Sequence, residues 1–205
     1  MSEANTKKDV WEMVRLGLTL VCYAVASCTV LALVNNFTSK KILLNQLDKA
    51  NAAMKEVFAQ ADEFKPVSDF EPSSNNSITL SDAYLAYADE KIVGAVIQVA
   101  GPTYDKGKLI VGVDSNGIVT GMRFLELTDS PGFGSKAKDD SYKLKNGKTF
   151  YGQFEGKDAK LGFIRNETFD AISGATITSD SVANLLSEGT SCLIKYLAMN
   201  GGQNE

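Results

Sequence analysis

The sequence predicts an α+β protein: one N-terminal transmembrane helix, followed by a domain in which helices pack an antiparallel sheet. Three observations lead to this fold class. Residues 16–34 form an uncharged apolar run long enough to cross a bilayer. Residues 83–127 contain β-branched segments joined by turn sequences, which is typical of antiparallel hairpins. Residues 182–197 place apolar side chains at helical spacing, which predicts a closing helix.

The composition excludes several classes of protein. The chain has 205 residues, of which 44% are hydrophobic, enough for one domain and an appendage. Its net charge of −4 and its lack of a dense Lys/Arg cluster argue against nucleic-acid binding. Histidine is absent, which excludes Ser-His-Asp and Cys-His catalysis and His-ligated zinc or haem. Cys22, Cys28 and Cys192 form no C-x-x-C pair, so we expect no metal site, and any redox chemistry needs an organic cofactor.

The apolar run from Leu16 to Val34 is 19 residues long and suits a single spanning helix. A cleaved signal peptide is one alternative, but the run is long for one and no A-x-A site follows it. A lipoprotein modified at Cys28 is another, but the chain stays apolar beyond that cysteine. Flanking charges leave the orientation nearly even. The basic residues are Lys7, Lys8 and Arg15 before the span, and Lys40 and Lys41 after it.

A second helical pattern follows the span, from about residue 39 to residue 64. Its apolar residues recur three or four apart, which predicts an amphipathic helix. We expect it to continue from the span and to dock on the domain or on another subunit, with a core helix of the domain as the alternative. Pro66 is expected to end it, so that residues 35–66 form the connecting segment. The polar residues 67–77 are expected to form a loop.

Two hairpins are expected at the start of the domain. Residues 83–87 and 92–99 are separated by charged turn residues, and they predict the first hairpin. Residues 108–114 and 118–127 predict the second, because Asp114-Ser115-Asn116-Gly117 between them is a strong turn sequence. The domain is therefore expected to begin as an antiparallel sheet.

A loop rich in proline and glycine follows the second hairpin. Pro131, Gly132, Phe133 and Gly134 predict a tight turn whose backbone can approach a ligand closely. Its plainest interpretation is a surface turn. Its functional interpretation is a wall against which a flat ligand packs, with Phe133 as a hydrophobic lid. The next segments are expected to be a short polar helix with a turn and two short strands: residues 135–149, 150–154 and 161–165.

Residues 170–179 form a hydroxyl-rich turn that contains a glycine and directly precedes the last helix. Ser179 or Asp180 is expected to be the N-cap of that helix. A helix N-terminus offers free N–H groups and a partial positive charge, so the turn suits a phosphate. A helix cap without any ligand is the alternative interpretation, because hydroxyl-rich caps are common.

The segment Asp170–Thr176, with the sequence DAISGAT, resembles the flavinylation motif D-x-x-[ST]-G-A-T of the FMN-binding domain family. In that family, an extracytoplasmic flavin transferase takes FMN from FAD and esterifies its phosphate to the motif threonine. The resemblance implies covalently attached FMN on Thr176, through a phosphothreonine linkage, and a recognition role for Asp170. It further implies that the neighbouring residues shape the phosphate end of the cofactor and that the last two of them donate hydrogen bonds to it. These neighbours are Ser173, Gly174, Ala175, Ile177, Thr178 and Ser179.

Residues 129–134, with the sequence DSPGFG, resemble the second motif of the same family, H-x-E-T-P-G-L-G. Asp129 replaces the glutamate, and Leu127 stands where the histidine would be, so any proton relay through that histidine is absent here. Ser130 and Phe133 are milder replacements, of threonine and leucine. The resemblance implies that four residues pack along the isoalloxazine ring or the ribityl chain: Pro131, Gly132, Phe133 and Gly134.

The N-terminal span, the total length and the motifs together resemble the RnfG family, the FMN-binding subunits of Rnf ion-translocating electron transport complexes. The likeness covers about residues 90–198 of the domain. It implies electron relay within a ferredoxin:NAD+ oxidoreductase coupled to Na+ or H+ translocation, with no catalytic residue and no independent substrate turnover. The implied partners are the other membrane subunits of the complex, the flavin transferase during maturation and membrane lipid.

The resemblance also implies a topology: a single pass through the cell (inner) membrane, residues 1–15 in the cytoplasm and residues 67–205 as an extracytoplasmic FMN-binding domain. Two other functions stay open. One is the NqrC family of the Na+-translocating NADH:quinone reductase, whose chains are usually longer. The other is a non-redox, membrane-tethered binding module in which the hydroxyl-rich turn only caps a helix.

Overall fold

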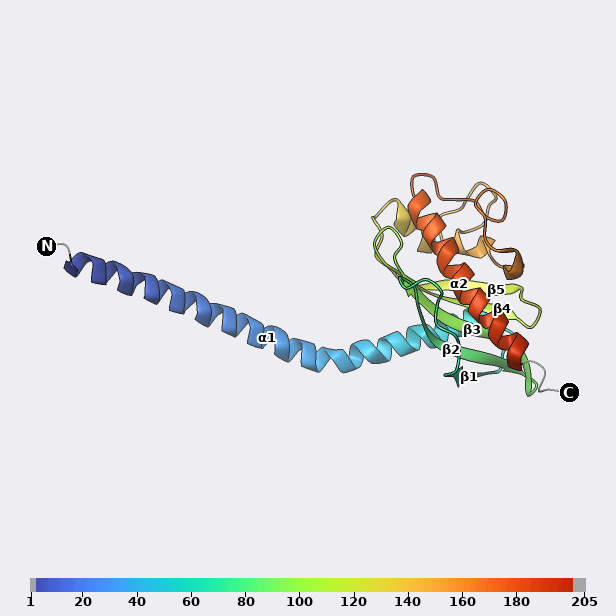
Figure 1. The fold of residues 1–205 in the computed structure, drawn as a ribbon, viewed down its shortest axis with the longest axis horizontal. Coiled ribbons are helices and arrows are strands. Elements are labelled where there is room, and N and C mark those ends of the chain that lie inside the picture. The colour runs from blue at the N-terminus through green and yellow to red at the C-terminus, as the bar shows by residue number, and fades with distance from the viewer. Residues whose placement is uncertain (1–2, 201–205) are drawn as a thin grey trace. The chain divides into compact units, whose positions relative to one another are not determined.

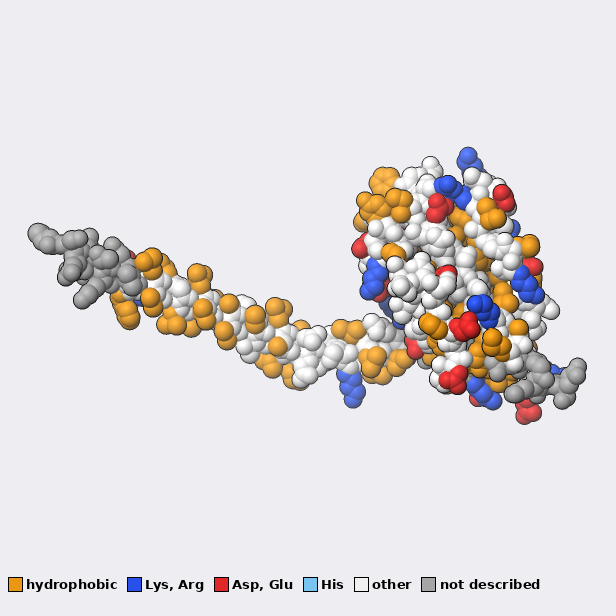
Figure 2. Space-filling view, in the orientation of Figure 1, with side chains coloured by type: hydrophobic (Ala, Val, Ile, Leu, Met, Phe, Trp, Pro, Cys, Tyr) orange, Lys and Arg blue, Asp and Glu red, His pale blue; other side chains and the backbone are white. Residues whose placement is uncertain are grey.

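The computed structural model describes residues 3–200 and divides the chain into two units, Met1–Asp48 and Lys49–Glu205. Helix α1 (Glu3–Val57) accounts for the described part of the first unit (Figure 1). The side chains of residues 11–49 are all exposed, and many of them are apolar (Figure 2). By length and composition, α1 is a candidate membrane-spanning helix. Within α1, the apolar run of residues 16–34 and the segment that follows it form one continuous helix.

The second unit is built on a five-stranded antiparallel sheet in which every strand pairs with its neighbour in sequence. Helix α2 (Thr176–Asn200) packs across one face of this sheet, and three short 3-10 helices lie between the last strand and α2 (Figure 1). The predicted α+β class is confirmed. The strands are β1 (Glu63–Val67), β2 (Thr79–Ala88), β3 (Lys91–Gly101), β4 (Gly107–Asp114) and β5 (Val119–Leu127). The 3-10 helices are η1 (Gly134–Lys138), η2 (Tyr151–Gln153) and η3 (Ala159–Leu161).

The main core lies between α2 and the sheet. Leu185, Leu186 and Leu193 of α2 are buried against apolar side chains of β3 and β4. Gly189 lets the helix approach the sheet closely, because a Cβ atom there would lie 2.5 Å from a methyl group of Val99. This contact places α2, and with it the turn that precedes α2, at a fixed position over the sheet.

The opposite face of the sheet is covered by the last turns of α1. Met54, Val57 and Phe58 are buried there against Val96 and other sheet residues. Near this contact Glu56 accepts a hydrogen bond from Arg123 of β5, with 2.8 Å between Oε2 and Nε. The end of α1 is therefore part of the core of the domain, in agreement with the alternative expectation of a core helix.

Three expectations about secondary structure are wrong. Helix α1 ends at Val57 and not near Pro66, which lies within β1 at the edge of the sheet, where a missing N–H is tolerated. Residues 150–154 form part of the 3-10 region around η2, because Phe150 and Phe154 both turn into the core, with ring centroids 5.5 Å apart. Leu161 is the last residue of η3, and residues 162–165 continue as irregular chain up to an isolated bridge between Arg165 and Phe169.

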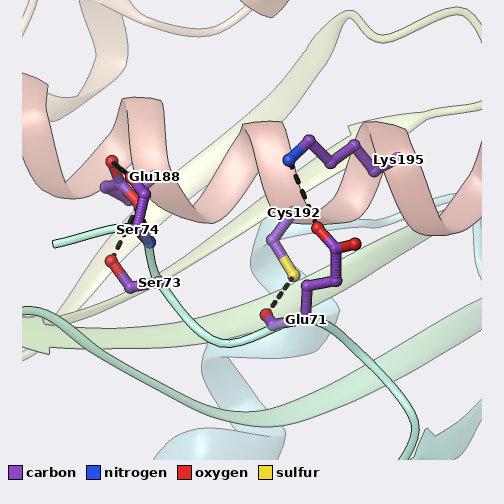
Figure 3. Close-up of polar contacts among 6 residues, drawn as sticks. All are labelled: Glu71, Ser73, Ser74, Glu188, Cys192 and Lys195. Carbon is purple, nitrogen blue, oxygen red and sulfur yellow. Dashed lines mark hydrogen bonds and ion pairs between the residues drawn. The ribbon is translucent and has the colours of Figure 1, made fainter. Parts of the chain in front are cut away.

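The segment between β1 and β2 lies along α2 and is tied to it by polar contacts (Figure 3). Glu188 accepts hydrogen bonds from the hydroxyls of Ser73 and Ser74, each at 2.8 Å, and from the Ser74 N–H at 3.1 Å. Further along the helix, Lys195 contacts the carboxylate of Glu71 at 3.2 Å. Hydrogen bonds from Ser74, the largest influence, and from Ser73 hold the pKa of Glu188 below its usual value despite partial burial.

Candidate functional site

The turn before α2 is shaped by the side chain of Ser179. Its hydroxyl accepts a hydrogen bond from the N–H of Ile172 at 3.0 Å and donates one to the carbonyl oxygen of Ala175 at 2.9 Å. The same carbonyl accepts the Ser179 N–H at 3.0 Å, which closes the first helical turn. The helix therefore begins at Thr176, and the prediction of Ser179 or Asp180 as its N-cap is wrong.

Thr176 occupies the first position of α2, and its side chain is exposed. The first N–H groups of a helix have no acceptor within the helix, so they can bind an anion beside this residue. Gly174 precedes it with a φ of +79°, a backbone conformation that suits glycine. A hydroxyl that can be reached from solvent is thus presented next to a set of N–H donors.

An open pocket of about 620 Å³ lies beside Thr176 and brings both sequence motifs together. The loop after β5 forms one wall and the turn before α2 forms the other, although they are far apart in the sequence. Phe133, 57% exposed, stands over Gly174. The lining residues are Tyr104, Ser130, Pro131, Phe133, Gly134, Gly174, Ala175, Thr176, Ile177 and Thr178.

Tyr104 is a pocket residue that the sequence does not reveal. It lies in the connection between β3 and β4, where no motif marks it, and it is 64% exposed. Only the pairing of these strands brings that connection beside the pocket. Conversely, Gly132, Ser173 and Ser179 do not line the pocket, and Ser179 is completely buried.

Asp129 lies behind the pocket wall and is only 3% exposed. Its carboxylate accepts hydrogen bonds from the hydroxyls of Thr103 and Thr178, each at 2.5 Å, and from the N–H groups of Tyr104 at 3.2 Å and Asp105 at 3.0 Å. Burial alone would raise the pKa of Asp129, but these hydrogen bonds outweigh it and hold the pKa below its ordinary value.

The hydroxyls of Thr178 and Ser179, which the resemblance assigns to the phosphate, both have partners within the protein. A hydroxyl has a single proton to donate. Thr178 donates it to Asp129, and Ser179 donates it to Ala175. In this structure both hydroxyls therefore help to hold the turn in shape, and their donation to a phosphate oxygen stays a prediction.

Asp170 lies outside the large pocket. It borders a smaller hollow of about 240 Å³, and its Oδ2 accepts a hydrogen bond from the side chain of Asn146 at 3.1 Å. The buried amide of Gln153 pairs with the Asp170 backbone in both directions: Oε1 accepts the N–H at 2.8 Å, and Nε2 donates to the carbonyl at 3.1 Å. Gln153 thus anchors the start of the turn, a role that nothing in its local sequence indicates.

The residues present fit a flavin mononucleotide. The pocket volume lies within the range of about 300–1,000 Å³ that is usual for small-molecule sites. Aromatic and aliphatic side chains, including Phe133, Tyr104 and Pro131, offer apolar surface for a flat ring. The start of α2 offers N–H groups for a phosphate at the same place as the Thr176 hydroxyl.

The fold and this pocket define an FMN-binding domain joined to a candidate membrane helix. Residues 104–190 match the family model described as FMN-binding domain, and residues 1–57 match the one described as RnfG N-terminal region. The chain belongs to the RnfG family of ion-translocating oxidoreductase complexes. It is therefore a subunit of such a membrane-bound electron transport complex, with FMN as its cofactor and the other subunits as its partners.

Three relatives illustrate the likeness. The RnfG-type subunit of the Na+-translocating ferredoxin:NAD+ oxidoreductase complex of Acetobacterium woodii is 30% identical over 203 residues, covering 88% of this chain and 93% of the relative. Its counterpart in the ion-translocating oxidoreductase complex of Salmonella typhimurium is 30% identical, with 82% and 84% covered. The corresponding protein of Methanosarcina acetivorans is 27% identical, with 87% and 93% covered.

Proposed function

We propose that this chain relays electrons through FMN attached covalently to Oγ1 of Thr176, within a complex that transfers electrons from ferredoxin to NAD+ and translocates Na+ or H+. The carrying observation is the position of Thr176: an exposed hydroxyl at the first residue of α2, beside an open pocket with apolar walls. When bound, the flavin supplies one- and two-electron chemistry. The chain positions it and limits its contact with water.

Attachment requires a flavin transferase with FAD as the donor. Oγ1 of Thr176 forms a bond to the phosphorus of the FMN half, the pyrophosphate bond of FAD breaks, and AMP leaves. The hydroxyl proton passes to the transferase or to solvent. Gly174 and the exposed Ser173 leave the turn open to the approaching enzyme, and Asp170, turned away from the pocket, is available for recognition.

In the mature protein, Pro131, Phe133 and Gly134 would pack along the ring or the ribityl chain, with Gly132 shaping the loop. Ala175 and Ile177 would border the phosphate, whose oxygens would accept hydrogen bonds from the N–H groups at the start of α2. Thr178 and Ser179 would stabilise the turn through the hydrogen bonds that their hydroxyls donate to Asp129 and to the Ala175 carbonyl.

For the topology, we propose that residues 1–15 lie in the cytoplasm, residues 16–34 cross the membrane in contact with lipid, and the domain that contains the sheet is extracytoplasmic. Two features support this arrangement. The apolar side chains of the span are exposed in the chain alone. The relatives belong to ion-translocating complexes, which act across a membrane.

The test is the covalent linkage. The full chain is produced together with a flavin transferase, denatured and run on a gel under ultraviolet light. We expect fluorescence to migrate with the wild-type chain, to disappear with Thr176→Ala and to persist, at equal or reduced yield, with the hydroxyl-retaining Thr176→Ser. Intact mass confirms the added FMN. A fluorescent Thr176→Ala band would contradict the assignment of Thr176, and an unmodified wild-type chain would favour a binding module without a covalent flavin.

A further inference from the structure

We propose that Asp129 is a positioning residue that holds a fixed negative charge directly behind the flavin pocket and thereby keeps the reduction potential of the flavin low. The inference rests on the proposed function, because it needs the flavin in this pocket. Three residues of the pocket wall contact Asp129. Tyr104 and Thr178 donate hydrogen bonds to it, and Gly134 packs so closely that a Cβ atom there would lie 2.8 Å from its Oδ2.

Within residues 3–200, no cationic side chain forms an ion pair with Asp129. Its four hydrogen-bond donors are two hydroxyls and two backbone N–H groups, all of them neutral. The start of α2 supplies only a partial positive charge. A buried carboxylate with these partners is weakly screened, so its field reaches the pocket.

This field distinguishes the two redox states of the cofactor. Reduction brings negative charge onto the flavin, and a negative charge behind the pocket wall repels it. The oxidised form is therefore favoured, and the midpoint potential falls. Charges on the protein surface have a much smaller effect, because water and salt screen them.

Asp129 also joins three segments of the chain: the β3–β4 connection, the loop after β5 and the first turn of α2. A purely structural role would act through the shape of the pocket alone. Two kinds of substitution separate the role of the charge from a purely structural role. One removes the charge, and the other removes a hydrogen bond but keeps the charge.

The experiment is a redox titration of the bound flavin, followed by visible absorbance, in the full chain produced with a flavin transferase. We expect Asp129→Asn to shift the midpoint potential to more positive values. Glu126→Gln, which removes an exposed carboxylate of β5, is the matched control and should leave the potential where it is. Thr178→Val keeps the charge and removes one donor, so the potential should stay unchanged or become more negative.

The outcomes separate the two proposals. A wild-type chain without covalent flavin overturns the proposed function. If the potential of the flavin does not move in Asp129→Asn, the role of the charge is overturned and the proposed function stands. An equal positive shift in Thr178→Val also overturns the role of the charge. Should Asp129→Asn fail to fold or to take up flavin, Thr178→Val and Thr103→Val decide the matter, since a positive shift in these charge-retaining variants contradicts the inference.

Discussion

Asp129 is a buried carboxylate whose hydrogen bonds make the stability of the domain depend on pH. Its pKa is lower in the folded chain than in the unfolded chain, where it lies near 3.9. The ionised form therefore stabilises the fold above that value, and this contribution is lost as the pH falls through the folded pKa. At pH 7 we expect Asp129→Asn to lower the free energy of unfolding by about 2 kcal/mol.

The measurement is urea denaturation of both proteins between pH 7 and pH 3. The difference in unfolding free energy between wild type and Asp129→Asn should be constant from pH 7 to about pH 5 and should shrink below about pH 4. A difference of the same size at pH 3 as at pH 7 would show that the ionised carboxylate is not what stabilises this region.

Single residues of the site differ in how far the sequence reveals them. Thr176 can be proposed from the sequence because the whole motif around it is contiguous. Gln153 and Tyr104 cannot, because each reaches the site only through contacts between segments distant in the chain. Ser179 is predicted as the N-cap of α2, and that prediction is wrong, because the helix begins at Thr176. A hydroxyl at a helix start can serve a cap, a ligand or, as here, the carbonyl and N–H of its own turn.

At the level of the elements, the packing of α2 on β3 depends on Gly189. Alanine is the better helix former by about 1 kcal/mol, yet its Cβ atom would meet Val99 at 2.5 Å and Ile97 at 3.3 Å. Because both neighbours are buried sheet residues, the helix must move away. We expect Gly189→Ala to lower the unfolding free energy by about 1–3 kcal/mol.

The matched control is Asn184→Ala, at an exposed position of the same helix, which should be neutral or slightly stabilising because only helix propensity changes. Thermal unfolding of both variants, followed by circular dichroism, gives the comparison. A Gly189→Ala protein as stable as Asn184→Ala would mean that α2 has freedom to shift over the sheet.

A helix or strand can be predicted from sequence where its pattern of apolar and polar residues matches its pattern of buried and exposed positions. Strands β2 to β5 are predictable because their apolar residues and turns are regular. Strand β1 is not, because it is short, mostly exposed and interrupted by Pro66, so that only its pairing with β2 makes it a strand. The aromatic run 150–154 has the sequence pattern of a strand but lies in the 3-10 region around η2. In a short segment, apolar residues that are buried cannot be told from residues that favour a strand.

At the scale of the whole molecule, the boundary between the two units lies inside α1, before the residues that cover the outer face of the sheet. We expect a chain of residues 49–205 to fold and to accept flavin. A chain of residues 60–205 lacks Met54, Val57 and Phe58, each of which contributes roughly 1.5–3 kcal/mol when buried. Their sum is comparable to the total stability of a domain, about 5–15 kcal/mol.

Urea denaturation and size-exclusion chromatography of the two truncated chains provide the measurement. The shorter chain should aggregate or unfold at a much lower urea concentration. Equal midpoints for the two chains would show that the end of α1 is not an essential part of the domain core.

Helix α2 is the last element of the described chain, and Thr176 stands at its start. The turn that presents this threonine is braced by Asp129 and Gln153, which belong to segments made earlier during synthesis. The turn can take its shape only after the sheet, the 3-10 region and α2 have come together. If the flavin is attached as proposed, a transferase that recognises this shape would modify only folded chains, and the covalent flavin would mark the chains that have completed folding.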